Sequence, residues 1–260
     1  MPGSDDRCQG VPNPMVVVDS VSYAYGKRQA VTNVHFAVDP GRIFGIVGSD
    51  GAGKTTLLRM IATMLPPAAG RILIDGKDVV AGRHQVKAAI GYMPQRFGLY
   101  LDLTVAENLD FFMDLFGVAG QQRQDRRRRY LGFSNLLPFT ERLAGDLSGG
   151  MKQKLGLACV LVHHPKVLIL DEPTNGVDPV SRREFWQILA EMRAAGMTII
   201  VSTAYLDEGE KCDDLALMHG GQILAQGSPG AMRAGFATLE EAMIARIADR
   251  VTDKGDGFAF

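Results

Sequence analysis

Cysteine is scarce and scattered in this sequence. The 260 residues contain three, Cys8, Cys159 and Cys212, and none lies in a C-x-x-C pair. An odd, dispersed set argues against a disulfide framework and against a structural zinc site. This usage suits a reducing compartment such as the cytosol.

Long apolar runs and a strong net charge are missing as well. No apolar stretch approaches the roughly 18 residues that a membrane span requires. Residues 1–14 carry Asp5 and Asp6 and no apolar core of a signal peptide. The net charge of -1 provides no global basic field for nucleic acid or anionic lipid. We therefore expect a soluble cytoplasmic chain that reaches any membrane through a partner and binds no nucleic acid.

The apolar patterns that are present predict an α/β fold. Residues 15–19 are rich in β-branched side chains, and residues 34–38 alternate apolar and polar positions, which favours an antiparallel sheet. Residues 43–47 form an apolar strand, and residues 167–170 and 198–201 are typical of buried parallel strands. The length allows one large domain, with or without an inserted lobe.

Turn residues and helical periodicity divide the chain further. Tyr23-Ala24-Tyr25-Gly26 is predicted as a turn, and Pro66-Pro67 is predicted to end the first helix. From about Thr104 to Val162 helical patterns replace strand signals, which indicates an inserted helical lobe. Residues 1–14, rich in proline and glycine, are predicted to be a disordered tail. Beyond about residue 235 we expect a mixed, mainly helical extension.

A glycine-rich loop carries the strongest chemical signal. Residues 48–55 read G-S-D-G-A-G-K-T, follow the strand at 43–47 and open a helical pattern. The glycines let the backbone turn its N–H groups inward, and the helix adds its positive dipole end. Lys54 is placed to reach the β- and γ-phosphates, and the Thr55 hydroxyl to complete a Mg²⁺ shell. The sequence therefore predicts a nucleoside triphosphate site at Gly48, Ser49, Asp50, Gly51, Ala52, Gly53, Lys54, Thr55 and Thr56.

Two carboxylates follow a buried strand. Asp171-Glu172 comes directly after residues 167–170, and ligands of open α/β sheets bind at that edge. Asp171 is expected to hold Mg²⁺, usually through a water, and Glu172 to polarise the water that attacks the γ-phosphate. The alternative is that both carboxylates cap the next turn, which Pro173 favours.

A second helix start resembles an anion site. Ser148-Gly149-Gly150 precedes a helical run and leaves backbone N–H groups uncovered. One complete phosphate loop and two such helix ends suggest a dimer, in which Ser148 and Gly150 of one copy close over nucleotide held by another. Taken alone, the same residues make an ordinary helix cap.

Together these motifs make the chain resemble an ATP-binding cassette (ABC) ATPase over residues 15–235. Residues 48–55 match the Walker A loop and residues 167–172 match Walker B. Gln95 matches the Q-loop glutamine, and Leu147-Ser148-Gly149-Gly150-Met151 the signature, with Met151 where the family has glutamine. Gly176-Val177-Asp178-Pro179 matches the D-loop.

The resemblance implies a P-loop NTPase with a RecA-like core, an antiparallel β subdomain and a helical subdomain over about residues 96–160. It implies a head-to-tail dimer, homodimeric or heterodimeric, that uses ATP and Mg²⁺. Tyr25 would stack on adenine, although a packed strand-end tyrosine is the alternative, and Asp178 would communicate across the dimer. The residues to which it assigns catalysis are Glu172, Lys54, Gln95, Ser148 and Gly150, and those for metal are Thr55, Gln95 and Asp171.

Shorter segments resemble the ATPase subunits of ABC-2-type drug, lipid and polysaccharide exporters. These are Gly98-Leu99-Tyr100, Tyr205-Leu206-Asp207-Glu208 and the C-terminal Leu239-Glu240-Glu241-Ala242. The resemblance implies a transmembrane permease as partner and a peripheral location on the cytoplasmic face of the inner membrane. Residues 236–260 form the C-terminal extension.

One position departs from the family pattern. Ser202-Thr203 is followed by Ala204, where the family usually has a switch histidine. A methyl group cannot donate a hydrogen bond to the γ-phosphate, and losing one such donor lowers a rate on the order of 10²–10³-fold. We expect binding to survive and hydrolysis to be slow. Ala204 is either natural, in a chain that pairs with a complete subunit or forms half of a tandem protein, or a deliberate substitution that holds the ATP-bound dimer.

Other readings stay open. Arg123 and Arg126 to Arg129 could grip nucleic acid or lipid, but a solvated helix face is favoured. A non-transport ABC ATPase acting on ribosomes or DNA, and a module that uses ATP only to dimerise, are further alternatives. A small-molecule kinase does not explain residues 148–150.

Overall fold

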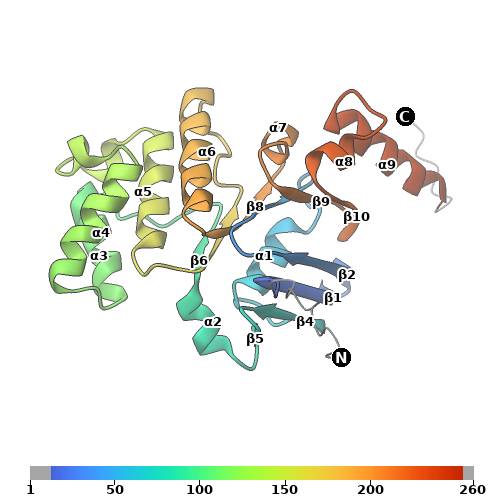
Figure 1. Cartoon of the computed structure of the whole chain (residues 1–260), viewed down its shortest axis with the longest axis horizontal. Helices are drawn as coiled ribbons and strands as arrows, with labels where there is room; N and C mark the ends of the chain where they lie inside the picture. Colours follow the sequence, from blue (N-terminus) through green and yellow to red (C-terminus); the bar gives the residue numbers. More distant parts are fainter. Residues whose placement is uncertain (1–12, 254–260) are drawn as a thin grey trace, which may run out of the picture.

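Two sheets and a lobe of helices make up the computed structural model, which describes residues 13–253 (Figure 1). The larger sheet has the order β10-β9-β3-β8-β7-β6, and the smaller one the order β2-β1-β4-β5. The predicted antiparallel sheet and buried parallel strands are therefore confirmed. The larger sheet consists of β3 (Ile43–Val47), β6 (Ile90–Met93), β7 (Val167–Asp171), β8 (Thr198–Thr203), β9 (Asp214–His219) and β10 (Gln222–Gly227).

The larger sheet is parallel except for its last strand. β3 pairs in parallel with β8 and β9, β7 pairs in parallel with β8 and β6, and β10 returns antiparallel to β9. All five residues of β3 and of β7 are buried, as expected for strands covered on both faces. Because these strands run the same way, β3, β7 and β8 all end at one edge of the sheet.

The smaller sheet consists of β1 (Val16–Tyr25), β2 (Arg28–Val38), β4 (Ala69–Ile74) and β5 (Lys77–Asp78). The predicted turn at residues 23–26 is wrong in extent, because Tyr23 and Tyr25 still belong to β1 and pair with β2. The reversal is tighter and is made by Gly26, whose φ of 58° is easily adopted by a residue without Cβ.

Helix α1 (Lys54–Ile61) lies between the two sheets. Its buried Leu57, Leu58 and Ile61 share one apolar cluster with β1, β2 and the inner face of the larger sheet. The helix ends five residues before Pro66, earlier than the prolines predict. Thr63 has a φ of 61°, so the chain has already left helical geometry there.

The lobe between β6 and β7 is built from α3 (Val105–Leu115), α4 (Gly120–Phe133) and α5 (Gly149–Leu161). Thr104 and Glu107 form a reciprocal capping box at the start of α3. A second apolar cluster joins these helices to α6 (Pro179–Ala194) and to the other face of the larger sheet. Helical structure from about Thr104 to Val162 is thus confirmed, with short 3₁₀ turns at Leu137–Phe139 and Ala144–Asp146.

The arginines of α4 are less solvated than expected. Arg123 and Arg127 pair with Asp110 of α3, and Arg126 donates to the carbonyl of Val162 at 2.5 Å. The sequence favours a solvated face for these arginines, and that prediction holds only for Arg128 and Arg129, which are exposed. The other three serve to attach α4 to its neighbours.

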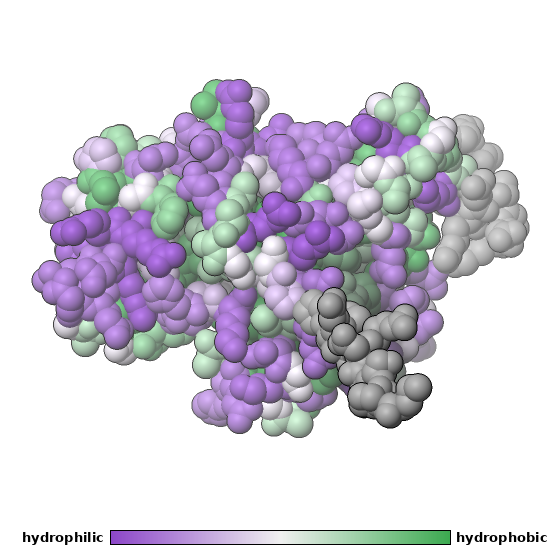
Figure 2. Space-filling model, viewed as in Figure 1, coloured by the Kyte–Doolittle hydropathy of each residue, from purple (hydrophilic) through white to green (hydrophobic). Residues whose placement is uncertain are grey.

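The remaining helices are α2 (Arg83–Ala89), α7 (Leu206–Gly209), α8 (Pro229–Arg233) and α9 (Leu239–Asp253). The predicted helix near the C-terminus is α9, whereas residues 1–12 and 254–260 of the predicted tails lie outside the described residues. Within residues 13–253, no helix has both the length and the apolar character to cross a membrane. The face shown in Figure 2 is mainly hydrophilic, most densely over the lobe of α3 and α4.

Candidate functional site

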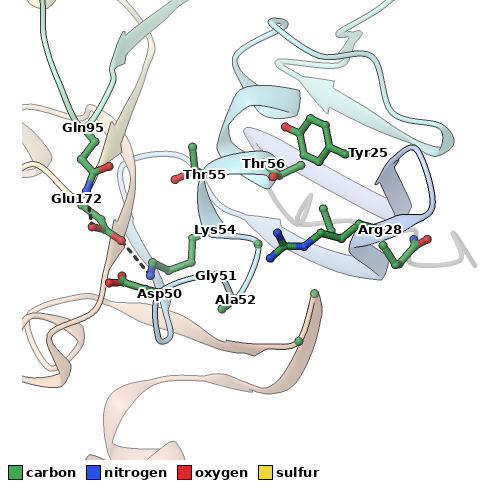
Figure 3. Close-up of a pocket in the computed structure, with 15 residues that line it drawn as sticks. Tyr25, Arg28, Asp50, Gly51, Ala52, Lys54, Thr55, Thr56, Gln95 and Glu172 are labelled. Carbon is green, nitrogen blue, oxygen red and sulfur yellow. Dashed lines mark hydrogen bonds and ion pairs between the residues drawn. The ribbon is translucent and has the colours of Figure 1, made fainter.

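A cleft of about 740 Å³ opens beside the start of α1 (Figure 3). It brings together the end of β1, the glycine-rich loop, the residues after β6 and β7, and the turn between β9 and β10. Of the predicted residues, it is lined by Tyr25, Asp50, Gly51, Ala52, Gly53, Lys54, Thr55, Thr56, Gln95 and Glu172. It is also lined by residues that the sequence did not single out: Arg28, Gln29, Ala30, Gly220 and Gly221.

The glycine-rich loop is pressed against strands on two sides. A Cβ on Gly48 would lie 2.2 Å from the carbonyl oxygen of Met218, and one on Gly53 would lie 2.3 Å from that of Ala30. Gly53 also has a φ of 103° and forms the N-cap of α1 without any side-chain hydrogen bond. The first N–H groups of a helix have no partner within it. The loop therefore presents uncapped N–H donors and a positive dipole end to the cleft.

Lys54 is buried at the centre of this arrangement, with 3% of its side chain exposed. Its ammonium donates to the carbonyl oxygens of Gly48 at 2.7 Å and Ser49 at 3.1 Å. It also forms an ion pair with Glu172, with Nζ 3.0 Å from Oε1. Three oxygens thus hold the charge, as a buried ammonium requires.

Glu172 sits at the end of β7 in a strained conformation, with a φ of 48°. Its second carboxylate oxygen accepts from the amide of Gln95 at 3.0 Å and from that of Asn175 at 3.2 Å. Figure 3 shows Gln95 and Lys54 approaching this carboxylate from opposite sides. The turn-capping alternative explains neither the ion pair nor the bond to Gln95.

Asp171 lies one residue earlier and faces α1. It accepts from the hydroxyls of Thr55 at 3.1 Å and Ser202 at 2.8 Å. Burial raises the pKa of Asp171, while these two hydrogen bonds oppose the rise. Burial and the nearby Asp171 charge together raise the pKa of Tyr92 to about 12, so its hydroxyl stays protonated.

These oxygens fit a magnesium nucleotide. Within residues 13–253 no group of three or more His, Cys, Asp or Glu is placed to hold a metal. Mg²⁺ is commonly bound through one or two carboxylates together with phosphate oxygens and waters. The adjoining Thr55 hydroxyl and Asp171 carboxylate match that donor set, whereas the amide of Gln95 bonds to Glu172 rather than to Asp171.

The outer wall of the cleft is aromatic and basic. Tyr25 is 45% exposed at the end of β1 and packs edge-on against Tyr23, with ring centroids 5.0 Å apart. Arg28, at the start of β2, lies next to it (Figure 3). Arg28 and the Gly220-Gly221 turn reach the cleft only through strand pairing, and no local sequence pattern could have revealed that.

Ser148 and Gly150 do not line this cleft. Ser148 is the exposed N-cap of α5 and accepts from the N–H of Met151 at 3.2 Å. Gly150 is buried, and a Cβ there would lie 2.3 Å from the Cβ of Ser181 in α6. Asp178, of the predicted D-loop, caps α6 by accepting from two backbone N–H groups. Within one chain these residues act as helix caps and packing contacts.

Ala204 follows β8 and is exposed. It lines a smaller cavity of about 120 Å³ with Asp50, Glu172, Thr174, Asn175, Thr203 and Tyr205. The structure thus brings residue 204 to the Glu172 end of the cleft. The side chain of Ala204 is a methyl group, which offers this cavity no hydrogen-bond donor.

The family model described as "ABC transporter" matches residues 31–175. A probable multidrug ABC transporter ATP-binding protein of Escherichia coli is 53% identical over 79% of this chain, which spans only 36% of that relative. A Nod factor export ATP-binding protein of Paraburkholderia xenovorans is 38% identical over 85% of this chain and 73% of its own length.

Solved structures give the same likeness. A structure of the ATP binding subunit of an ABC transporter superposes with a TM-score of 0.80 at 28% identity, covering 90% of this chain and 99% of its own. The cbiO1 protein of Clostridium perfringens, part of the cbiONQ transporter complex, also gives 0.80, at 29% identity over 93% and 97%. These matches confirm the predicted α/β P-loop NTPase fold.

Proposed function

This chain belongs to the ABC transporter family of ATP-binding proteins, and from that premise we propose that it binds and hydrolyses Mg²⁺-ATP to drive export through a separate permease. The ATPase domain would span residues 15–235, with the helical subdomain over about 96–160 and an extension at 236–260. The observation that carries the proposal is the buried ion pair between Lys54 and Glu172 at the end of the glycine-rich loop.

The residues around that ion pair would have separate roles in binding the nucleotide and in hydrolysis. The N–H groups at the start of α1 and the Lys54 ammonium would hold the phosphates, in the way a helix N-terminus binds anions. Thr55 and Asp171 would hold Mg²⁺, which supplies charge neutralisation on the phosphates when it is bound. Glu172 would accept a proton from the attacking water, with Gln95 fixing the carboxylate. Tyr25 would stack on adenine, which is poorly base-selective.

The site would be completed by a second ATP-binding chain. Ser148 is exposed at the start of α5 and contributes nothing to the cleft of its own chain. We infer that Ser148 and the α5 N-terminus of one copy close over the nucleotide of another copy, identical or related. Asp178 precedes Ser181, the α6 residue that contacts Gly150 of α5, by three residues, and it would relay between the two sites.

The transport role rests on the relatives. One relative is named a probable multidrug ABC transporter ATP-binding protein, and another is named a Nod factor export ATP-binding protein. We propose an exporter of that broad kind, with a transmembrane permease as partner and a peripheral place on the cytoplasmic face of the inner membrane. The substrate would be set by the permease.

The test is ATP turnover by the full chain with Mg²⁺, alone and reconstituted with a transmembrane permease that co-purifies with it. We expect binding of ATP by the chain alone, slow hydrolysis, and faster hydrolysis with the permease. Lys54→Ala should lose binding, whereas Lys87→Ala, on the exposed side of α2 and outside the cleft, should retain it. A chain that binds no ATP at millimolar concentration would contradict the proposal.

A second candidate is favoured by Ala204 alone: a module that uses ATP to dimerise and does not hydrolyse it. Single-turnover assays separate the two. Bound ATP that stays intact over hours, even with the permease present, supports the module. Conversion of the bound ATP to ADP supports the ATPase that drives export.

A further inference from the structure

A carboxylate that the proposed chemistry does not use lies fully buried behind the cleft. Glu208, in the short helix α7, is 0% exposed. Each of its carboxylate oxygens accepts a hydrogen bond of 2.6 Å from a threonine hydroxyl, one from Thr174 and the other from Thr203. Both threonines are 1% exposed. A buried carboxylate with two short, charge-assisted bonds fixes the positions of both donors.

The two donors belong to the two segments that flank the reacting end of the cleft. Thr174 follows Glu172 by two residues, and Thr203 precedes Ala204 by one. Thr174 and Thr203 both line the small cavity of about 120 Å³ that lies between Glu172 and Ala204. The Thr203 hydroxyl also accepts from the N–H of Tyr205 at 3.0 Å, which orients the turn around residue 204.

A third segment, the start of α6, brings a positive charge near the Glu208 carboxylate. Arg182, in the first turn of α6, has Nε 4.0 Å from a Glu208 oxygen. Its guanidinium lies 4.8 Å from the centre of the Tyr205 ring. Glu208 therefore contacts the chain after β7 and the end of β8, and it faces the start of α6, although it belongs to none of them.

From this arrangement we propose that Glu208 is a positioning residue for hydrolysis. It joins the segment that carries Glu172 to the turn that carries residue 204, and so sets the width of the cavity between them. This inference rests on the proposed function. A displacement of about 1 Å at a reacting centre can lower a rate by about 100-fold. Glu208 touches no residue of the glycine-rich loop among its described contacts, so ATP affinity should not depend on it.

The test compares substitutions that disrupt the hydrogen bonds of the Glu208 carboxylate with substitutions that keep them. Glu208→Gln keeps the shape and removes the charge. Thr203→Val removes the hydroxyl at similar size, whereas Thr203→Ser retains it. Asp207→Asn is the matched control on the exposed side of the same helix turn. Each is made in the full chain and in its Ala204→His variant, and the measurements are ATP affinity, single-turnover rate and melting temperature.

We expect Glu208→Gln and Thr203→Val to slow single-turnover hydrolysis by about 10- to 100-fold with ATP affinity within about twofold of the parent. Thr203→Ser and Asp207→Asn should match the parent. Equal hydrolysis rates in all four variants, or a loss of ATP affinity as large as the loss of rate, would overturn the inference. If Glu208→Gln fails to fold, the Thr174→Val and Thr174→Ser pair decides, because the Thr174 hydroxyl bonds to Glu208, whereas Thr203→Val also removes the bond from the Tyr205 N–H.

The outcome also separates this inference from the function on which it rests. If neither the parent chain nor its Ala204→His variant converts bound ATP to ADP, the proposed function is wrong. If Glu172→Gln is inactive while Glu208→Gln and Thr203→Val are fully active, only the role of Glu208 is wrong.

Discussion

The two glycine-rich helix starts, at α1 and at α5, use similar local chemistry and reach opposite outcomes. Helix α1 begins at Gly53 with no side-chain cap and faces a cleft. Helix α5 begins at Ser148, whose hydroxyl caps the helix on the exposed surface. The uncapped end of α1 leaves backbone N–H donors free for an anion in the cleft. At α5 the Ser148 hydroxyl already accepts from one backbone N–H, and the helix end lies on the surface.

The difference comes from what surrounds each turn. The α1 loop is pressed between β2 and β9, where Gly48 and Gly53 leave room only for backbone. At the start of α5, Gly150 lies against Ser181 of α6, whereas a Cβ on Gly149 would meet nothing within 4 Å. Strands of distant sequence thus make one helix start a binding site and leave the other as a surface.

The largest effect should come from separating binding at α1 from the step that α5 would assist. Glu172→Gln removes the carboxylate that is expected to accept the proton from water. We expect hydrolysis to fall by about 10²–10⁴-fold, the usual worth of general base catalysis, with ATP still bound. Turnover and equilibrium binding of labelled ATP measure this. Unchanged turnover would mean that another residue is the base.

The next effect tests whether hydrolysis is limited within the chain's own cleft or by the α5 surface. Ala204→His adds a donor at the Glu172 end. We expect the rate to rise on the order of 10²–10³-fold, the effect of one preorganised donor. Single-turnover assays check this, with Ala204→Gly as the control that adds nothing. A rate equal to that of the parent would mean that residue 204 does not limit the rate of hydrolysis.

A matched pair of lysines contrasts the two helix starts directly. Lys54 opens α1 and is buried, whereas Lys152 in the first turn of α5 donates to the carbonyl of Gly145 on the surface. Truncating one partner of a buried charge pair across a binding interface costs about 2–5 kcal/mol of binding free energy, and Lys54 would form such a pair with the phosphates. Lys54→Ala should therefore weaken ATP binding by at least about 30-fold, and Lys152→Ala should leave it unchanged. Equal losses would erase the distinction between the two ends.

The smallest effect concerns packing at α5. Gly150→Ala places a methyl 2.3 Å from the Cβ of Ser181, while Gly149→Ala meets nothing within 4 Å. Overpacking of this kind costs about 1–3 kcal/mol. Denaturant unfolding should show that loss for Gly150→Ala and little change for Gly149→Ala. Equal stabilities would mean that α6 yields without strain.

Most residues that line the cleft beside α1 could be named from the sequence, because their signals are local. Residues 48–55 carry the strand, the glycines and the helix start in one stretch, and the carboxylates of residues 171 and 172 follow directly on a buried strand. Arg28 and Gly221 could not be predicted, because their presence in the cleft depends on how β2 and β9 pair with or pack against the loop. The hydroxyl bridges of Glu208 depend likewise on three segments that meet only in the fold.

Local signals misled in two places. The sequence predicts a turn at Tyr23-Ala24-Tyr25-Gly26, yet strand pairing with β2 extends through both tyrosines. The arginines of α4 have the composition of a solvated face, but the aspartate that Arg123 and Arg127 meet belongs to another helix. Tertiary contacts override composition at both sites.

The central claim is that the α5 start of one copy meets the α1 loop of another across one ATP. Two chains with one engineered surface cysteine each test it, one carrying Ser148→Cys and the other Ser49→Cys. Both also carry Cys8→Ser and Glu172→Gln, and both keep the buried Cys159 and Cys212. They are mixed and oxidised with and without Mg²⁺-ATP. We predict a disulfide-linked heterodimer that forms only with Mg²⁺-ATP. Bound ATP without any ATP-dependent link between the two chains would contradict the claim.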